Sequence, residues 1–198
     1  MIKVIRSIVA NVLQALYQPF WFAVIMSILI TFFYMSAEEN GLKVLLSKWY
    51  KRIKSDRDFR KVLYFSFITV MILFRTLLNR NMWANPLSDV IGVWGFTNAK
   101  GEFTTEAVEN FILFVPFIFG LLWTFKDKLI GKGRFIKVMY VSLKYAFMFS
   151  LSIEMLQLFL RLGTFQLSDL FFNTMGGLIG GIIYYFGSKV QNKMSKFD

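Results

Sequence analysis

The sequence predicts an all-α, polytopic membrane helix bundle with about five transmembrane helices. Hydrophobic residues make up 56% of the 198 residues, and Phe alone occurs 24 times. Soluble domains usually contain about 45–50% apolar residues, whereas the mean hydropathy here is +0.53. The apolar residues also gather into five runs separated by short polar or basic segments. We therefore expect residues 1–198 to form a single membrane domain.

Each apolar run is long enough to cross a bilayer as a helix, because about 20 helical residues span about 30 Å of hydrocarbon. The runs lie near residues 12–36, 62–79, 107–125, 138–160 and 168–187. The first is unusually long, so we expect it to tilt or to start at the interface. It also lacks a small-residue cleavage pattern, which predicts a retained anchor rather than a signal peptide.

The distribution of Lys and Arg predicts the orientation. Eight of these residues lie between Ala37 and Lys61 and five between Lys126 and Lys137, but only two between Arg80 and Glu106. Cytoplasmic loops are the ones enriched in Lys and Arg. The N-terminus is therefore expected outside and the C-terminus inside, although Lys3 and Arg6 oppose this orientation at the first helix.

Residues 40–60 read as a basic, amphipathic cytoplasmic loop. Its apolar residues recur at helical spacing, with Lys and Arg mostly around the other face. The apolar residues are Leu42, Leu45, Leu46, Trp49 and Ile53. Such a helix is expected to lie on the inner leaflet. Residues 81–105, on the other side, mix aromatic residues with turns such as Asn85-Pro86, and we expect a lid or a re-entrant segment there.

The composition excludes several kinds of chemistry. The chain has no Cys and no His, which removes disulfides, thiolate nucleophiles, His acid/base catalysis and the usual zinc sites. No nucleophile motif or nucleotide loop is present, so the sequence assigns no cofactor and leaves enzymatic activity undecided. The net charge of +11 comes from residues that flank the apolar runs, which favours anionic lipid headgroups over nucleic acid.

Eight strongly polar residues fall in the predicted extracytoplasmic halves of the helices. They are Arg75, Glu109, Asn110, Glu154, Gln157, Arg161, Asp169 and Asn173. A charged group at membrane depth costs roughly 2.5–3.5 kcal/mol and normally faces the bundle interior or a wet cavity. Guanidinium groups suit phosphate, so we expect a ligand-binding site on the outer side. The alternative is that the charges pair only to fix helix registry.

Spacing adds detail to this prediction. Glu154, Gln157 and Arg161 are three and four residues apart, which predicts a single stripe on one helix face. Gly176, Gly177, Gly180 and Gly181 predict close packing of the last helix against its neighbours. Pro116 leaves the Ile112 carbonyl without its helical donor, so a kink is expected there.

Three blocks of this sequence carry a resemblance to a known family. The first contains Asn110, Phe114 and Pro116; the second has Glu154 and Gln157 followed by Arg161; the third is Asp169, then Asn173-Thr174 and Gly176. In this order they resemble the VanZ-like family over a core of about residues 70–187. Helix one and the first basic loop lie outside that region.

The resemblance implies a small, multi-pass protein of the bacterial cell membrane, linked to resistance to teicoplanin and related glycopeptides. These drugs act outside the cell on a lipid-linked cell-wall precursor. We therefore expect the outer polar site to bind a phospholipid or polyprenyl-phosphate headgroup and to limit drug access. In this hypothesis Arg75 and Arg161 bind phosphate, and Glu109, Glu154 and Asp169 orient them.

Other interpretations stay open. Glu154 and Asp169 are candidate catalytic residues for an enzyme that modifies a lipid headgroup, because two carboxylates in a low-dielectric cavity can divide acid and base roles. No metal site is assigned, although Glu109, Glu154 and Asp169 offer the oxygen ligands that a hard divalent cation accepts. A third interpretation is a structural partner within a larger membrane assembly.

Overall fold

A computed structural model describes residues 2–36, 42–82, 84–98, 101–131 and 133–194. Residues 40 and 41 of the predicted basic loop, and the chain ends at 1 and 195–198, lie outside these ranges. The elements are α1 (Ile2–Ser36), α2 (Leu42–Ser55), α3 (Arg57–Leu73), the π-helical turn η1 (Phe74–Leu78), α4 (Glu106–Leu129), α5 (Phe135–Leu160) and α6 (Leu167–Met194). No strand occurs in the described ranges beyond an isolated bridge between Thr97 and Phe103.

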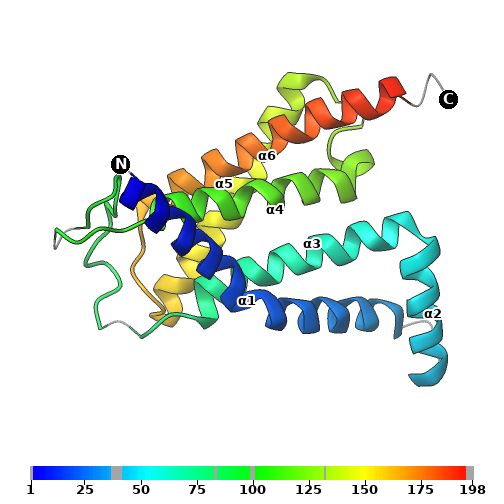
Figure 1. Ribbon diagram of the computed structural model, residues 1–198, viewed down its shortest axis with the longest axis horizontal. Coiled ribbons are helices and arrows are strands. Elements are labelled where there is room, and N and C mark those ends of the chain that lie inside the picture. Colours follow the sequence, from blue (N-terminus) through cyan, green and yellow to red (C-terminus); the bar gives the residue numbers. More distant parts are fainter. Residues whose placement is uncertain (1, 37–41, 83, 99–100, 132, 195–198) are drawn as a thin grey trace.

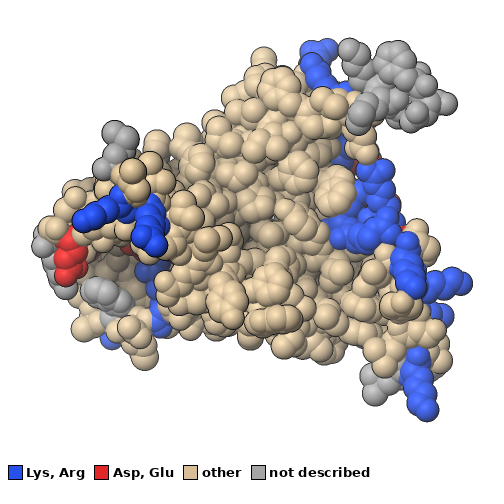
Figure 2. Space-filling view, in the orientation of Figure 1, with Lys and Arg blue, Asp and Glu red and all other residues tan. Residues whose placement is uncertain are grey.

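Five helical stretches are long and apolar enough to cross a membrane: Ile2–Met35, Arg57–Leu78, Glu106–Leu129, Phe135–Leu160 and Leu167–Gln191. The predicted all-α membrane bundle is therefore confirmed. The first turn of α1 and the described residues between 81 and 105 lie at one end, which we call the loop end, and α2 lies at the opposite end, which we call the basic end (Figure 1). Lys and Arg gather at the basic end, and a broad surface without charged residues separates the two ends (Figure 2). The sequence predicts that the loop end faces outward.

Helix α1 runs for 35 residues and contains Pro19. Its two parts point in clearly different directions (Figure 1). A proline inside a helix removes one backbone hydrogen bond and its ring crowds the preceding turn, which is a common cause of bending. The long first run is thus one helix, and its second part packs along α3.

The core forms around α4, which packs extensively on α6 and also contacts α3. Phe114, Ile118 and Leu122 are almost completely buried there. A Cβ added at Gly176 would lie 2.1 Å from the Phe111 carbonyl oxygen, and one at Gly180 would lie 2.2 Å from the Val115 carbonyl oxygen. Only glycine allows α6 to approach the α4 backbone so closely.

Gly177 and Gly181 allow a similarly close approach between α6 and α5. A Cβ at Gly177 would lie 2.3 Å from the Ala146 Cβ, and one at Gly181 would lie 1.9 Å from the Ser142 Oγ. One face of α6 therefore contacts α4 and the adjacent face contacts α5. This close three-helix contact sets the positions of the polar residues at the loop end.

The expected distortion at Pro116 is not seen in the backbone dihedrals, which stay helical at that residue. Proline fixes φ near −65°, a helical value, and α4 is held between α3 and α6. The departure from helical geometry is instead at Phe125, with φ −113° and ψ 26°. The last turn of α4, at the basic end, is therefore redirected.

Helix α2 has the expected amphipathic character, but its apolar residues contact the protein itself. Leu45 is buried, and Trp49 stacks on Phe32 and donates from Nε1 to Thr31 Oγ1 at 3.0 Å. Asp56 then caps α3 by accepting the backbone N–H groups of residues 58 and 59. Because Asp56 alone connects α2 to α3, α2 stays next to the ends of α1 and α3. These ends cover much of the apolar face of α2, which was expected to lie on the inner leaflet.

Candidate functional site

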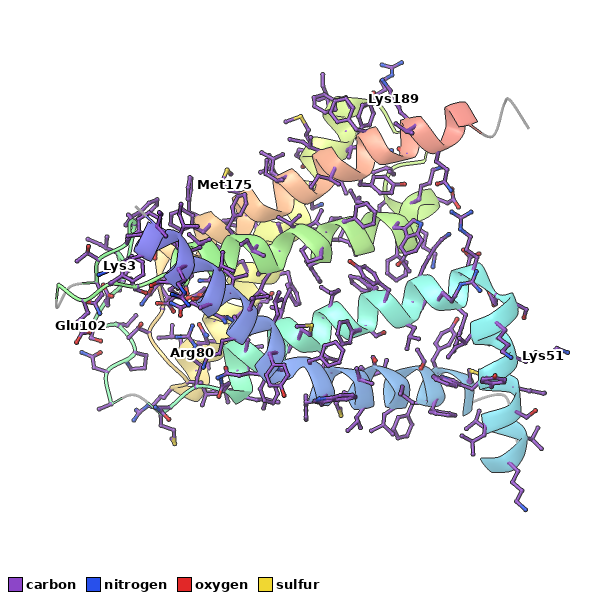
Figure 3. All side chains as sticks on the ribbon, in the orientation of Figure 1. Lys3, Lys51, Arg80, Glu102, Met175 and Lys189 are labelled. Carbon is purple, nitrogen blue, oxygen red and sulfur yellow. The ribbon has the colours of Figure 1, made fainter. Side chains whose placement is uncertain are left out.

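A cavity of about 420 Å³ opens at the loop end. Its walls come from α1, η1, the segment before α4 and the first turn of α4. The lining residues are Asn11, Gln18, Arg75, Asn79, Arg80, Phe103, Thr104, Thr105, Glu106 and Glu109. Arg80 lies at the same end as Lys3 and Glu102, far from Lys51 and Lys189 (Figure 3). We call this opening the loop-end cavity.

Arg75 reaches the cavity from a π-helical turn. The turn spans Phe74–Leu78, and Asn79 closes it by donating its backbone N–H to the Phe74 carbonyl at 2.8 Å. A π turn adds one residue to the helical repeat, so it changes the direction of the side chains that it carries, and such turns are frequent at functional sites. The sequence did not predict this irregularity.

Two ion pairs join the end of η1 to the beginning of α4. The Arg75 guanidinium pairs with Glu109, whose carboxylate also accepts the hydroxyl of Thr105. Asn11 of α1 donates to Thr105 Oγ1 at 2.9 Å. The second pair joins Arg80 Nη2 to Glu106 Oε1 at 3.0 Å. Both guanidiniums are therefore held in place while they line an open cavity.

A second group of polar residues, which we call the buried polar layer, comprises Asn110, Glu154, Gln157, Asp169 and Asn173. All are buried, and Glu154 and Gln157 are only 1% exposed. Glu154 and Asp169 interact electrostatically with each other and with Arg80 and Glu106 of the cavity. The layer thus adjoins the loop-end cavity, but none of its residues lines that cavity.

Three residues of the buried polar layer form hydrogen bonds with neighbouring helices or with the turn between α5 and α6. Glu154 accepts the backbone N–H of Gln166 at 2.8 Å, which fixes the turn between α5 and α6. Gln157 donates to the Thr76 carbonyl of η1 at 2.7 Å. Asn173 donates to Ser150 Oγ at 2.9 Å. These bonds join α5, α6 and η1.

Asn173 Oδ1 lacks a hydrogen-bond partner among the described residues. Asn110 Nδ2 forms no hydrogen bond of ordinary geometry there, but the Asn110 side chain lies beside the Asp169 carboxylate and interacts with it. An unpaired buried polar atom costs about 1–3 kcal/mol. Native proteins keep few such atoms, and each calls for an explanation beyond packing. The buried polar layer therefore does not satisfy every amide atom that it contains.

Arg161 is separated from the other predicted site residues. Helix α5 ends at Leu160, and Arg161 adopts the left-handed conformation with φ 55° and ψ 37°. Its side chain is exposed and does not line the cavity. The predicted stripe is therefore wrong at this position, because the three- and four-residue spacing applies only while the helix continues.

Residues 86–92 cover the turn between α5 and α6. Phe165 donates its backbone N–H to the Pro86 carbonyl at 2.9 Å, and Leu167 donates to Val90 at 2.8 Å. Gly92, with φ +73°, lies so close to Ser168 that a Cβ would approach its Oγ to 2.0 Å. The segment lies outside the helices at the loop end (Figure 1), as a cover and not as a re-entrant segment.

The structure also adds residues that the sequence analysis did not select. Arg80 and Glu106 were counted only as loop boundaries, although they lie five residues from Arg75 and three from Glu109. Asn11 and Gln18 are seven residues apart on α1, which places them on one face. That spacing of two polar residues in an apolar helix was the signal that could have found them.

The described residues contain no group of three His, Cys, Asp or Glu side chains that could hold a metal ion. Glu109 is paired with Arg75 in the cavity, whereas Glu154 and Asp169 belong to the buried polar layer. Glu109, Glu154 and Asp169 therefore do not form such a group among the described residues.

Comparison with known proteins decides the family. A family model described as VanZ/LLP1 matches residues 20–188. The chain belongs to the VanZ/LLP1 family. Protein VanZ of Enterococcus faecium is 31% identical over 134 residues, which cover 66% of this chain and 74% of that relative. No solved structure matches the chain.

The match to the VanZ/LLP1 family includes part of α1 and all of α2. It therefore begins well before the region of about 70–187 that carries the three sequence blocks. Together with the five spanning helices, family membership identifies a multi-pass bacterial membrane protein.

Proposed function

We propose that the loop-end cavity binds the phosphate of a lipid headgroup, either a phospholipid or a polyprenyl phosphate. Binding there would limit the access of a glycopeptide to the lipid-linked cell-wall precursor. One observation carries the proposal: Arg75 and Arg80 line a single cavity, and each is paired with a carboxylate from the first turn of α4.

The chemistry of the lining fits a phosphate ester. A guanidinium has five N–H donors, so one carboxylate partner leaves donors free for phosphate oxygens. The amides of Asn11, Gln18 and Asn79 offer partners for hydroxyl groups. In the predicted topology the cavity is on the outer side, where the pyrophosphate of the lipid-linked precursor lies at the membrane surface.

The resistance part of the proposal comes from similarity. The relative described above is named Protein VanZ, and the family resemblance implies teicoplanin resistance. The proposal differs from the sequence hypothesis in one respect: Arg80 takes the phosphate-binding role first given to Arg161.

Binding is tested with the purified full-length chain by native mass spectrometry. The ligands are a short-chain polyprenyl phosphate, a phosphatidylglycerol and the polyprenol without phosphate. Arg75→Gln and Arg80→Gln are each expected to weaken binding of the phosphate-bearing lipid at least about tenfold, or about 1.4 kcal/mol. Arg161→Gln is the matched control, because it removes the same charge from the turn after α5, which is hydrogen-bonded to the segment before α4.

Two results would overturn the binding proposal. One is an equal loss of affinity in all three variants, which would indicate a general effect of charge. The other is equal binding of the polyprenol, which would remove phosphate from the interaction.

Resistance is tested by teicoplanin susceptibility of a sensitive Gram-positive host, with vancomycin as comparator. Wild type, Arg75→Gln, Glu154→Gln and Arg161→Gln are compared at matched membrane levels. Protection by wild type and Arg161→Gln, with loss in Arg75→Gln, is the expected result. Equal protection by all variants would show that the cavity has no part in resistance.

The enzyme alternative has less support from the geometry. Glu154 and Asp169 are buried and neither lines the loop-end cavity, and Glu154 is already bound to the backbone of Gln166. A change in the lipid profile of the host that requires Glu154 but not Arg75 would favour a reaction over binding.

A further inference from the structure

A second opening, which we call the basic-end groove, lies at the other end of the bundle. It has a volume of about 910 Å³ and is bounded by α3, α4 and α6. None of its lining residues belongs to the loop-end cavity or the buried polar layer. The groove therefore needs its own explanation.

The groove exists because of the way three helices meet. Helix α4 packs against both α3 and α6, whereas α3 and α6 are not a packed pair among the described residues. α4 lies between them, and they stand well apart toward the basic end (Figure 1). Gly187 lines the groove, and a Cβ added there would meet no atom within 4 Å.

One wall of the groove is aromatic. Phe119 lies 6.2 Å from Trp123 and 6.0 Å from Tyr184, measured between ring centroids, and all three line the groove. The rings come from the membrane-spanning parts of α4 and α6. An acyl chain lying along this wall would meet apolar surface at the depth where lipid tails begin.

The rim of the groove is charged. Arg57, Lys61 and Lys126 face Asp58 and Asp127, which leaves one more cation than carboxylates. Lys61 is already paired with Asp58 at 2.6 Å, and its Nζ lies 6.0 Å from the Trp123 ring centroid. Arg57 and Lys126 are exposed on α3 and α4. A monoanion therefore complements the rim better than a strongly charged anion does.

These groups also lie at the right depth for a headgroup. Arg57 begins one spanning stretch, and Lys126 lies three residues before the end of another, which runs to Leu129. Basic groups next to spanning helices attract anionic lipids. The same residues that predict topology thus border a defined groove with an apolar wall.

We propose that the basic-end groove is a binding site for one anionic phosphodiester lipid whose headgroup carries hydroxyls, the chemistry of phosphatidylglycerol. The phosphate lies between Arg57 and Lys126, and the headgroup hydroxyls donate to Asp58 and Asp127. One acyl chain follows the wall formed by Phe119, Trp123 and Tyr184. This site is separate from the loop-end cavity in residues and in place.

The test uses the purified full-length chain and native mass spectrometry with phosphatidylglycerol, phosphatidylethanolamine and phosphatidylcholine. Gly187→Leu fills the groove without changing its charge, and the open space at Gly187 allows the variant to fold. Arg57→Gln with Lys126→Gln removes the rim cations. Arg134→Gln with Lys137→Gln is the matched control, because it removes two exposed cations near the same end that do not line the groove.

The expected result is one phosphatidylglycerol bound at least about tenfold more tightly than the other two lipids. Gly187→Leu and the rim double variant lose this preference, and the control keeps it. Free glycerol phosphate, added at the same concentration, does not compete. Equal losses in the rim and control variants, or undiminished binding by Gly187→Leu, would overturn the proposal. Competition by glycerol phosphate would also overturn it, because the acyl chain would then play no part.

Discussion

The loop-end cavity and the adjacent buried polar layer contain the same kinds of side chain in different roles. In the cavity, Arg75 pairs with Glu109 and Arg80 pairs with Glu106. The Arg75 and Arg80 side chains remain 18% and 27% exposed. In the layer, Glu154 is 1% exposed and accepts the backbone N–H of Gln166. A partly exposed pair keeps donors for a ligand, whereas a buried group bound to backbone fixes how the helices meet. The comparison separates a binding role from a positioning role.

Both regions depend on the contact between α4 and α6, so breaking it has the largest expected effect. Gly180→Val would place a Cβ 2.2 Å from the Val115 carbonyl oxygen. Because that atom is backbone, the helices must separate, and the cost should exceed the usual 1–3 kcal/mol of overpacking, at about 3 kcal/mol or more. We expect a much lower melting temperature in detergent, with loss of headgroup binding.

Gly187→Val is the matched control for Gly180→Val. It makes the same change on the same helix, where a Cβ meets no atom within 4 Å. Its melting temperature should stay close to that of wild type. A similar loss of stability in both variants would mean that valine in α6, and not the α4 contact, causes the effect.

The Arg75–Glu109 pair gives the next largest effect. Glu109→Leu leaves Arg75 without its partner and should cost about 2–3 kcal/mol, somewhat below the 3–5 kcal/mol of a fully buried pair. The double variant with Arg75→Leu should regain most of that stability, because it removes the unpaired charge. Headgroup binding should not return. Recovery of both stability and binding in the double variant would assign the pair to helix packing alone.

A substitution in the buried polar layer should lower stability and leave headgroup binding almost unchanged. Gln157→Leu removes the donor to the Thr76 carbonyl and should lower stability by about 1–2 kcal/mol. Headgroup affinity, measured on folded protein, should change less than about twofold. Gln14→Leu, at an exposed position of α1, is the control for the change in residue type. A large loss of headgroup affinity in Gln157→Leu would show that the buried polar layer is part of the binding site.

The smallest effect is expected at Arg161. This residue is exposed and has a positive φ of 55°, so Arg161→Gln should change stability by less than about 0.5 kcal/mol. Arg161→Gly should be neutral or slightly stabilising, because glycine adopts the left-handed region without strain. Thermal melting of both variants checks this. A clear loss of headgroup binding in either one would restore Arg161 to the site.

Much of the site was recognisable from residue type and position. Glu109, Glu154 and Asp169 stood out because charges in apolar runs are costly, and the structure brings all three to the loop end. The separation of Glu109 from Glu154 and Asp169 could not be predicted, since it depends on which helix faces meet. Arg80 was missed because a cation at the end of an apolar run usually marks the interface.

The sequence by itself determined the number of spanning helices, the location of the basic segments and the family. These follow from hydropathy, from charge and from short motifs, all of which are local properties of the chain. Only the tertiary structure decided which polar residues share a cavity. The π turn at Arg75 and the left-handed cap at Arg161 redirect side chains by small backbone changes, and Gly176 and Gly180 let α6 approach the backbone of α4. Contacts between distant segments stabilise these backbone conformations, and residue spacing along the chain does not reveal those contacts.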